Sequence, residues 1–309
     1  MNTRRYRPFP ILVLASATLS TLHADVTTRY KTEMTMNPAL QALAKGVNLP
    51  APQETALRLK GGKGFSSSMG ITSIVDLSTK EITVLDAATM RYAKMPSEQF
   101  VDQAARAMPE IPAGARAAIA GMKSSVSSTK LTGRTAVIQG VDAEEREIVV
   151  TVDGPSMPNA PAGPSIRMVM QLWTAKAGEA TRVPAIRELT EYSLDSFATM
   201  NPIENIDKMM KQFPDLSGAI EPLMKEMHSR TPILRMHVDL FMPALVAILR
   251  NAPGLDEGAP LVQVNYELVE LSTAPVPDSV FQIPEGYQEA SPSELMQALF
   301  AKAKAAAQQ

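Results

Sequence analysis

The chain has 309 residues, with 30 basic and 32 acidic side chains and no cysteine. The lack of cysteine excludes disulfides, thiol chemistry and the acylated cysteine of a bacterial lipoprotein. A formal charge of −2 argues against nucleic acid as a partner, and the length is that of one large domain or of a domain with insertions.

Residues 1–24 have the pattern of a secretory signal peptide. A basic head that ends at Arg7 precedes an apolar run from Phe9 to Leu22, and Ala24 closes an approximate small-residue cleavage site. The alternative is a membrane anchor, but the run is short and rich in Ser and Thr. We therefore expect cleavage near Ala24 and a soluble periplasmic or secreted protein with no transmembrane segment in the mature chain.

Strands dominate the first part of the mature chain. Residues 26–36 alternate between two faces, and residues 55–60 do so again. Gly61-Gly62-Lys63-Gly64 lacks the frame of a phosphate-binding loop and is interpreted as a turn. Residues 70–96 predict a meander of three short strands, in which Asp86 bonds to backbone N–H groups of the second turn.

The middle of the chain mixes helices and strands. Helices are predicted from Ser97 to Met108 and from about 113 to 122. A hairpin is predicted from 135–139 and 146–152, and the acidic residues near its tip could attract a cation but are more typical of a solvated turn: Asp142, Glu144, Glu145 and Glu147. The proline-rich stretch 153–165 indicates a loop. Residues 166–174 form a strand with two apolar faces, which we expect to be covered on both sides.

The last third begins with a helical block at 184–230, made of three segments that each have one apolar and one charged face. Residues 231–242 could form a helix or a strand, and Pro232 and the β-branched content favour a strand through about Phe241. A strand is predicted at 261–272, and Val280 and Phe281 are expected to end the sheet. A capping box at Ser291 opens a last helix. Because the strands are joined mainly by short turns and the helices come in blocks, the predicted class is α+β with an antiparallel sheet.

Four segments of the chain resemble the lipoprotein-carrier superfamily, whose members include LolA and LolB, and above all a related exported family of unknown function. They are SIVDLSTKEITVLDAATMRYAKMP within residues 70–96, Val183–Leu189, Thr231–Met236, and Val276–Phe281 continued by Pro284–Tyr287. The four segments follow one another in order and extend over most of the mature chain.

The resemblance implies an incomplete antiparallel β-barrel, that is, a curved sheet with helices covering its concave face. It places this half-barrel domain at 25–290, with helical insertions near 97–123 and 184–230 and a C-terminal helix at 291–309. The concave apolar face of such a domain accepts an acyl chain or another apolar ligand.

The sequence does not contain a recognisable catalytic motif. The two histidines after residue 24, His228 and His237, do not have metal-site or triad spacing. The S-x-x-K spacing at residues 127–130 lacks the companion motifs of penicillin-recognising enzymes. A hydrolase would need a nucleophile–base pair that the pattern does not supply. We therefore predict no enzyme activity, no catalytic residue, no metal and no cofactor.

Methionines are the most suggestive side chains, because flexible thioethers adapt to varied apolar shapes. The predicted ligand lining consists of Met168, Met170, Trp173, Met209, Met210, Met224 and Phe241. Ordinary core filling is the alternative for these residues. Two functions follow: an exported protein that binds a lipid or acyl chain, or a structural or envelope protein-interaction module with a fully packed interior.

Overall fold

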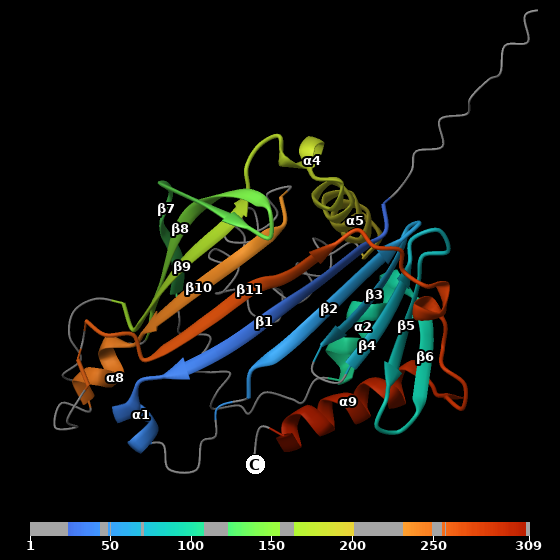
Figure 1. The fold of residues 1–309 in the computed structure, drawn as a ribbon. Coiled ribbons are helices and arrows are strands. Elements are labelled where there is room, and N and C mark those ends of the chain that lie inside the picture. The colour runs from blue at the N-terminus through green and yellow to red at the C-terminus, as the bar shows by residue number, and fades with distance from the viewer. Residues whose placement is uncertain are drawn as a thin grey trace, which may run out of the picture.

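One large open β-sheet forms the body of the molecule, which we describe from a computed structural model. The residues that the structure describes are 24–43, 49, 51–68, 71–107, 123–154, 164–200, 231–248, 255–256 and 258–306. Within them, twelve strands follow the order β12-β6-β5-β4-β3-β2-β1-β11-β10-β9-β8-β7. Neighbouring strands are antiparallel except for β12 and β6, which are parallel. The sheet is twisted and curved (Figure 1).

The strands and helices alternate little along the chain, so the predicted α+β class is confirmed at this level. The strands are β1 (Val26–Met36), β2 (Gln53–Lys60), β3 (Lys63–Ser68), β4 (Ile71–Asp76), β5 (Glu81–Asp86), β6 (Arg91–Pro96), β7 (Lys123–Ile138), β8 (Val141–Asp153), β9 (Ile166–Ala175), β10 (Ile233–Phe241), β11 (Val262–Ser272) and β12 (Gln288–Glu289). The helices are α1 (Pro38–Leu43), α2 (Ser97–Ala107), α4 (Glu179–Arg182), α5 (Pro184–Met200), α8 (Pro243–Ile248), α9 (Pro292–Ala306) and the 3-10 helix η1 (Asp278–Phe281).

Two aspartates set the turns of the predicted meander, which forms as β4, β5 and β6. Asp76 Oδ1 accepts hydrogen bonds from the backbone N–H groups of Ser78 (2.9 Å) and Thr79 (3.3 Å). Asp86 Oδ1 accepts one from the N–H of Ala88 (3.0 Å). A side-chain oxygen that bonds two or three residues ahead mimics a backbone turn, so each aspartate reverses the chain at the end of its strand.

The β7–β8 hairpin differs from its prediction because the turn is shorter and the strands are longer. Only Gln139 and Gly140 connect the strands, and both have left-handed backbone angles, with φ of 50° and 77°. Two consecutive residues with positive φ match the twist of a hairpin, so no longer loop is needed. The prediction of a solvated tip at residues 142–147 is therefore wrong for Glu145, whose side chain is 1% exposed and accepts hydrogen bonds from Thr132 and Arg134.

Strand β7 lies at one end of the sheet, and its pairing with β8 is interrupted twice. The register shifts between Val126 and Ser128 and again between Leu131 and Thr135. Gly133, in the second interruption, has a φ of 80° that favours glycine. The strand is thus divided into three paired runs, 123–126, 128–131 and 135–138.

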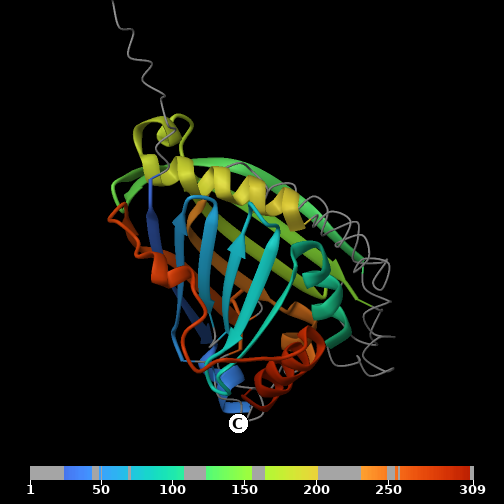
Figure 2. The same cartoon turned by 90° about the vertical axis from the view of Figure 1, so that its right-hand side faces the viewer.

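Two core clusters hold helices against the sheet. One joins α9 to β4, β5 and β6, with Leu295 and Leu299 buried against Ile82, Val84 and Met95. The other joins α5 to the sheet through Ile186 and Leu189, which pack with Val26, Leu59 and other residues. Helices α5, α2 and α9 follow one another beside the sheet (Figure 2).

Most other predicted elements have a counterpart in the structure. The predicted helices at 113–122 and 201–227 lie outside the described residues, as does the predicted signal peptide 1–24 except for Ala24. The strand expected at Val280–Phe281 is wrong, because η1 forms there with a hydrogen bond from Val280 N to Pro277 O (3.1 Å). Of the helices that the structure describes, none is long and apolar enough to cross a membrane.

Candidate functional site

An apolar strip crosses five neighbouring strands on one face of the sheet. The cross-strand register aligns two rows, and because residues directly opposite each other share a face, both rows lie on the same side. The strip consists of Met34, Val264, Val238, Met170 and Ile148 in one row, and Met36, Val262, Leu240, Met168 and Val150 in the other.

The strip is closed at its β8 end and more open at its β1 end. Ile148 is fully buried, and Val150 and Met170 are each 5% exposed. Met34, at the other end, is 37% exposed and is the one strip residue among the exposed large apolar side chains of the described chain.

On the opposite face, β10 and β11 carry polar side chains, whereas Val169 of β9, which lies opposite Asp239, is 8% exposed there. His237 pairs through Nδ1 with Asn265 Oδ1 (2.7 Å) and through Nε2 with Asp239 Oδ1 (3.1 Å), and Gln263 Nε2 donates to the same Asp239 oxygen (2.7 Å). Arg235 donates to Glu267 Oε1 (3.0 Å from Nε). This ladder of polar pairs is typical of a face in contact with water, so the two faces of β10 and β11 differ in chemistry.

The structure brings together only part of the predicted ligand lining. Met168 and Met170 lie in the strip. Trp173, which packs against the core cluster beneath α5, and Phe241 do not, because each is an odd number of positions from a strip residue on its own strand and so points to the opposite face. There, the Arg235 guanidinium lies 6.0 Å from the Trp173 ring centroid, and that of Arg167 lies 5.0 Å from the Phe241 centroid. Met209, Met210 and Met224 lie outside the described residues.

Valines contribute strip positions that the methionine argument did not include. Val238, Val262 and Val264 alternate with polar neighbours along β10 and β11, so their common face could have been found from period-two patterning. The extension of this face onto β1 could not be found in the same way, since β11 pairs with β1, which is far away in sequence.

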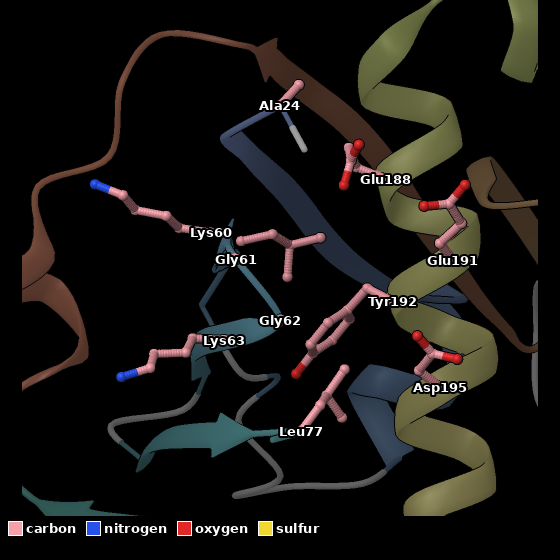
Figure 3. Close-up of a pocket in the computed structure, with 11 residues that line it drawn as sticks. Ala24, Lys60, Gly61, Gly62, Lys63, Leu77, Glu188, Glu191, Tyr192 and Asp195 are labelled. Atoms are coloured by element: carbon pink, nitrogen blue, oxygen red, sulfur yellow. The ribbon is translucent and has the colours of Figure 1, made fainter. Parts of the chain in front are cut away.

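A small pocket of about 60 Å³ lies between α5 and the β2–β3 turn (Figure 3). Its lining includes Ala24, Leu59, Lys60, Gly61, Gly62, Lys63, Leu77, Glu188, Glu191, Tyr192 and Asp195. Both lysine side chains leave the pocket on the side away from α5 (Figure 3). Lys60 Nζ lies 2.8 Å from Asp278 Oδ1, and Lys63 Nζ lies 3.4 Å from Asp76 Oδ2, so each is paired outside the pocket wall.

The tyrosine of this pocket stays protonated over the whole ordinary pH range. Burial raises the pKa of Tyr192 to about 12, because the phenolate would lose its hydration. The ring also packs over Gly64, where an added Cβ would lie 2.0 Å from the Tyr192 hydroxyl. A phenol with such a pKa is no general base near neutrality.

Groups suited to metal binding are not assembled in the described part of the chain. No cluster of three or more His, Asp or Glu side chains there has the geometry to hold an ion. His237 is held by Asn265 and Asp239, and His228 lies outside the described residues.

Comparison with known proteins gives no family. No protein-family model matches the chain, and a search of curated proteins gives no match. The fold therefore defines the class of this protein: it is an α+β protein with a large open sheet, and one face of that sheet carries an apolar strip.

Proposed function

We propose that the protein is an exported, non-enzymatic binder of a lipid or another apolar ligand. The observation that carries the proposal is the apolar strip, with a polar ladder on the other face of β10 and β11. Five strands at their usual spacing give each row a length of about 19 Å. Such a row offers continuous contact to an extended acyl chain.

The energetics of this proposal are favourable for a small buried length of chain. Each buried methylene contributes about 0.8 kcal/mol, so ten methylenes would contribute about 8 kcal/mol before the cost of ordering the ligand. In the proposed carrier the strip belongs to the concave face of a half-barrel, as in the LolA and LolB resemblance, and helices cover that face. Entry occurs at the β1 end, where Met34 is 37% exposed.

Native mass spectrometry of protein purified from its own periplasm tests this function. We expect co-purified lipid or, for stripped protein, saturable uptake of a fluorescent fatty acid. Protein that is consistently lipid-free and takes up no fatty acid would overturn the proposal.

A matched pair of variants locates the binding surface. Met34→Asn places a polar group on the strip, whereas Thr35→Asn places one on the opposite face of the same strand. Met34 is partly exposed, so its substitution leaves the fold intact. We expect Met34→Asn to weaken fatty-acid binding by about fivefold, the equivalent of about 1 kcal/mol, and Thr35→Asn to leave it unchanged. Equal effects of the two would contradict binding at the strip.

A packed structural or envelope protein-interaction module is the second candidate. It is favoured by the small size of the pocket at α5, about 60 Å³, compared with about 300–1,000 Å³ for most small-molecule sites. Under this reading the protein takes up no fatty acid, and crosslinking in the envelope captures a protein neighbour instead.

Export is part of the proposal. It rests on the basic head, apolar run and Ala24 of residues 1–24. Fractionation should find the protein in the periplasm or the medium, and its mass should equal that of the chain from Asp25. A full-length cytoplasmic protein would contradict export.

A further inference from the structure

The predicted cleavage bond, Ala24–Asp25, lies at the wall of the pocket beside α5. Ala24 itself lines that pocket. Strand β1 begins only two residues later, at Val26, which is fully buried between β2 and the α5 cluster. The chain on the C-terminal side of the bond is therefore already part of the folded sheet.

Asp25 is fixed in place by its own side chain. Its Oδ2 accepts a hydrogen bond from Val276 N (2.7 Å) and lies 3.9 Å from Lys60 Nζ. Lys60 Nζ in turn donates to Val276 O (2.8 Å) and pairs with Asp278 Oδ1 (2.8 Å). These contacts hold the Asp25 side chain without any contribution from Ala24.

The facing wall of the pocket carries carboxylates from α5. Glu188 lies beside Ala24, with Glu191 and Asp195 further along the helix (Figure 3). The Glu188 side chain is only 9% exposed, and its ion pair with Arg187 has an N–O distance of 3.7 Å, longer than a hydrogen bond. A nearly buried carboxylate gains most from a cation at hydrogen-bond distance.

We propose that processing creates the partner of Glu188. Water hydrolyses the Ala24–Asp25 peptide bond: the released peptide keeps the new carboxylate of Ala24, and the mature chain keeps an α-ammonium on Asp25. This ammonium occupies the space left by Ala24, pairs with Glu188 and fastens the start of β1 to α5. The inference rests on the export proposal above, and it makes the docking of α5 tighter in the mature protein than in the precursor.

The first measurement is the pKa of the α-amino group in protein that begins at Asp25. An unperturbed α-amino group has a pKa of about 7.7–8.0. The carboxylates around it are Glu188, Glu191 and Asp195 of α5, Asp278 of η1 and that of Asp25 itself. The cations are Lys60 of β2, Lys63 of β3, which pairs with Asp76, and Arg187 of α5, while Tyr192 is neutral. Carboxylates are in excess, so we expect the α-amino pKa to rise by about one unit. An unshifted value would overturn the pairing.

The second measurement is a double-mutant cycle between N-terminal acetylation, which removes the charge, and Glu188→Gln. We expect acetylation to lower the Tm of the mature protein by about 2–4 °C and to have little effect in Glu188→Gln protein. Glu98→Gln, on an exposed position of α2, is the matched control and should leave the acetylation effect intact. An acetylation effect of equal size in all three proteins would overturn the inference.

N-terminal sequencing of the exported protein separates the two proposals. A mature chain that starts elsewhere contradicts this inference through its cleavage site, whereas export itself still stands. A chain that starts at Asp25 but shows a normal α-amino pKa and no coupling contradicts the ion pair alone. Fatty-acid binding by the same samples reports on the proposed function separately.

Discussion

The rings of Tyr30 on β1 and Tyr266 on β11 stack with their centroids 4.5 Å apart and their planes 8° from parallel. Tyr30 is 7% exposed and belongs to the cluster beneath α5, against which Tyr266 packs. The two residues are 236 positions apart, yet strand pairing places Tyr266 opposite Thr32, two residues from Tyr30. The stack thus joins the first strand of the chain to its last long one.

Alkaline pH should weaken the fold through these tyrosines. Burial raises the pKa of Tyr30 to about 12, whereas in the unfolded chain it is about 10. Between these values the unfolded state has lost the proton that the folded state still holds, so stability falls as pH rises. The free energy of unfolding should decrease by about 1.4 kcal/mol per pH unit for Tyr30. Denaturant titrations from pH 9 to 12 should show a smaller slope for Tyr30→Phe; an identical slope would contradict the assignment.

Low pH should weaken the meander through Asp86, whose side chain is 2% exposed. Burial opposes its ionisation, but hydrogen bonds from Thr89 Oγ1 (2.9 Å) and Ala88 N, together with Lys302 at 3.6 Å, outweigh burial and lower its pKa. Its contribution is therefore present above its unfolded pKa and is lost as pH falls through the lower folded one. Asp86→Asn should be less stable than the parent at pH 7. In urea titrations at decreasing pH, its free energy of unfolding should fall less steeply than that of the parent. Lys302→Ala, which keeps the turn bonds, should lose less stability.

Removing the Arg134 side chain should lower the free energy of unfolding, because it leaves the buried Glu145 carboxylate without its cation. Arg134 Nε and Thr132 Oγ1 both donate to Glu145 Oε2. Leaving a buried carboxylate without its cation costs about 1–3 kcal/mol, and the lower half of that range is expected because the Arg134 side chain is 56% exposed. Chemical denaturation of Arg134→Ala measures the loss.

A second ion pair on the same hairpin serves as the control for Arg134. Lys130 pairs with Glu147 at 3.0 Å, but the Glu147 side chain is 22% exposed and can be rehydrated. Lys130→Ala should therefore lose less stability than Arg134→Ala, and Glu145→Gln should recover part of the loss in Arg134→Ala protein. A larger loss from Lys130→Ala would contradict the importance of burial at Glu145.

Gly64 should not tolerate a side chain while Tyr192 is present. An alanine Cβ would lie 2.0 Å from the Tyr192 hydroxyl and 2.3 Å from Cζ, so the Tyr192 ring or α5 would have to shift. Overpacking of this kind costs about 1–3 kcal/mol. Thermal unfolding of Gly64→Ala should show the loss, and adding Tyr192→Ala should make the two substitutions less than additive. Full additivity would mean that the clash is relieved in another way.

Local patterns predicted much of the fold. Alternation found β1, the Asp86 turn was assigned correctly, and Ser97 and Ser291 marked the starts of α2 and α9. The β7–β8 hairpin was mispredicted because Gln139, one of its two turn residues with positive φ, is not a residue type that is common in turns. Local propensity also missed η1, whose two hydrogen bonds run from Val280 N to Pro277 O and from Gln282 N to Ser279 O.

The candidate site was less predictable because it depends on long-range register. Met168 and Met170 could be placed on one face of a strand by alternation alone. That Met170 lies opposite Val238, and Val238 opposite Val264, follows only from the pairing of β9, β10 and β11. Grouping Trp173 with the methionines ignored the alternation of its own strand, which places its ring over the opposite face.

An open sheet ends in free backbone groups, and a long straight border strand would recruit neighbouring molecules into fibrous aggregates. Strand β7 is interrupted twice, so its regular runs, 123–126, 128–131 and 135–138, are each four residues long. A strand from another molecule would therefore find no longer continuous ladder on β7. At high concentration the sheet can thus stay unclosed without acting as a template for its own polymerisation.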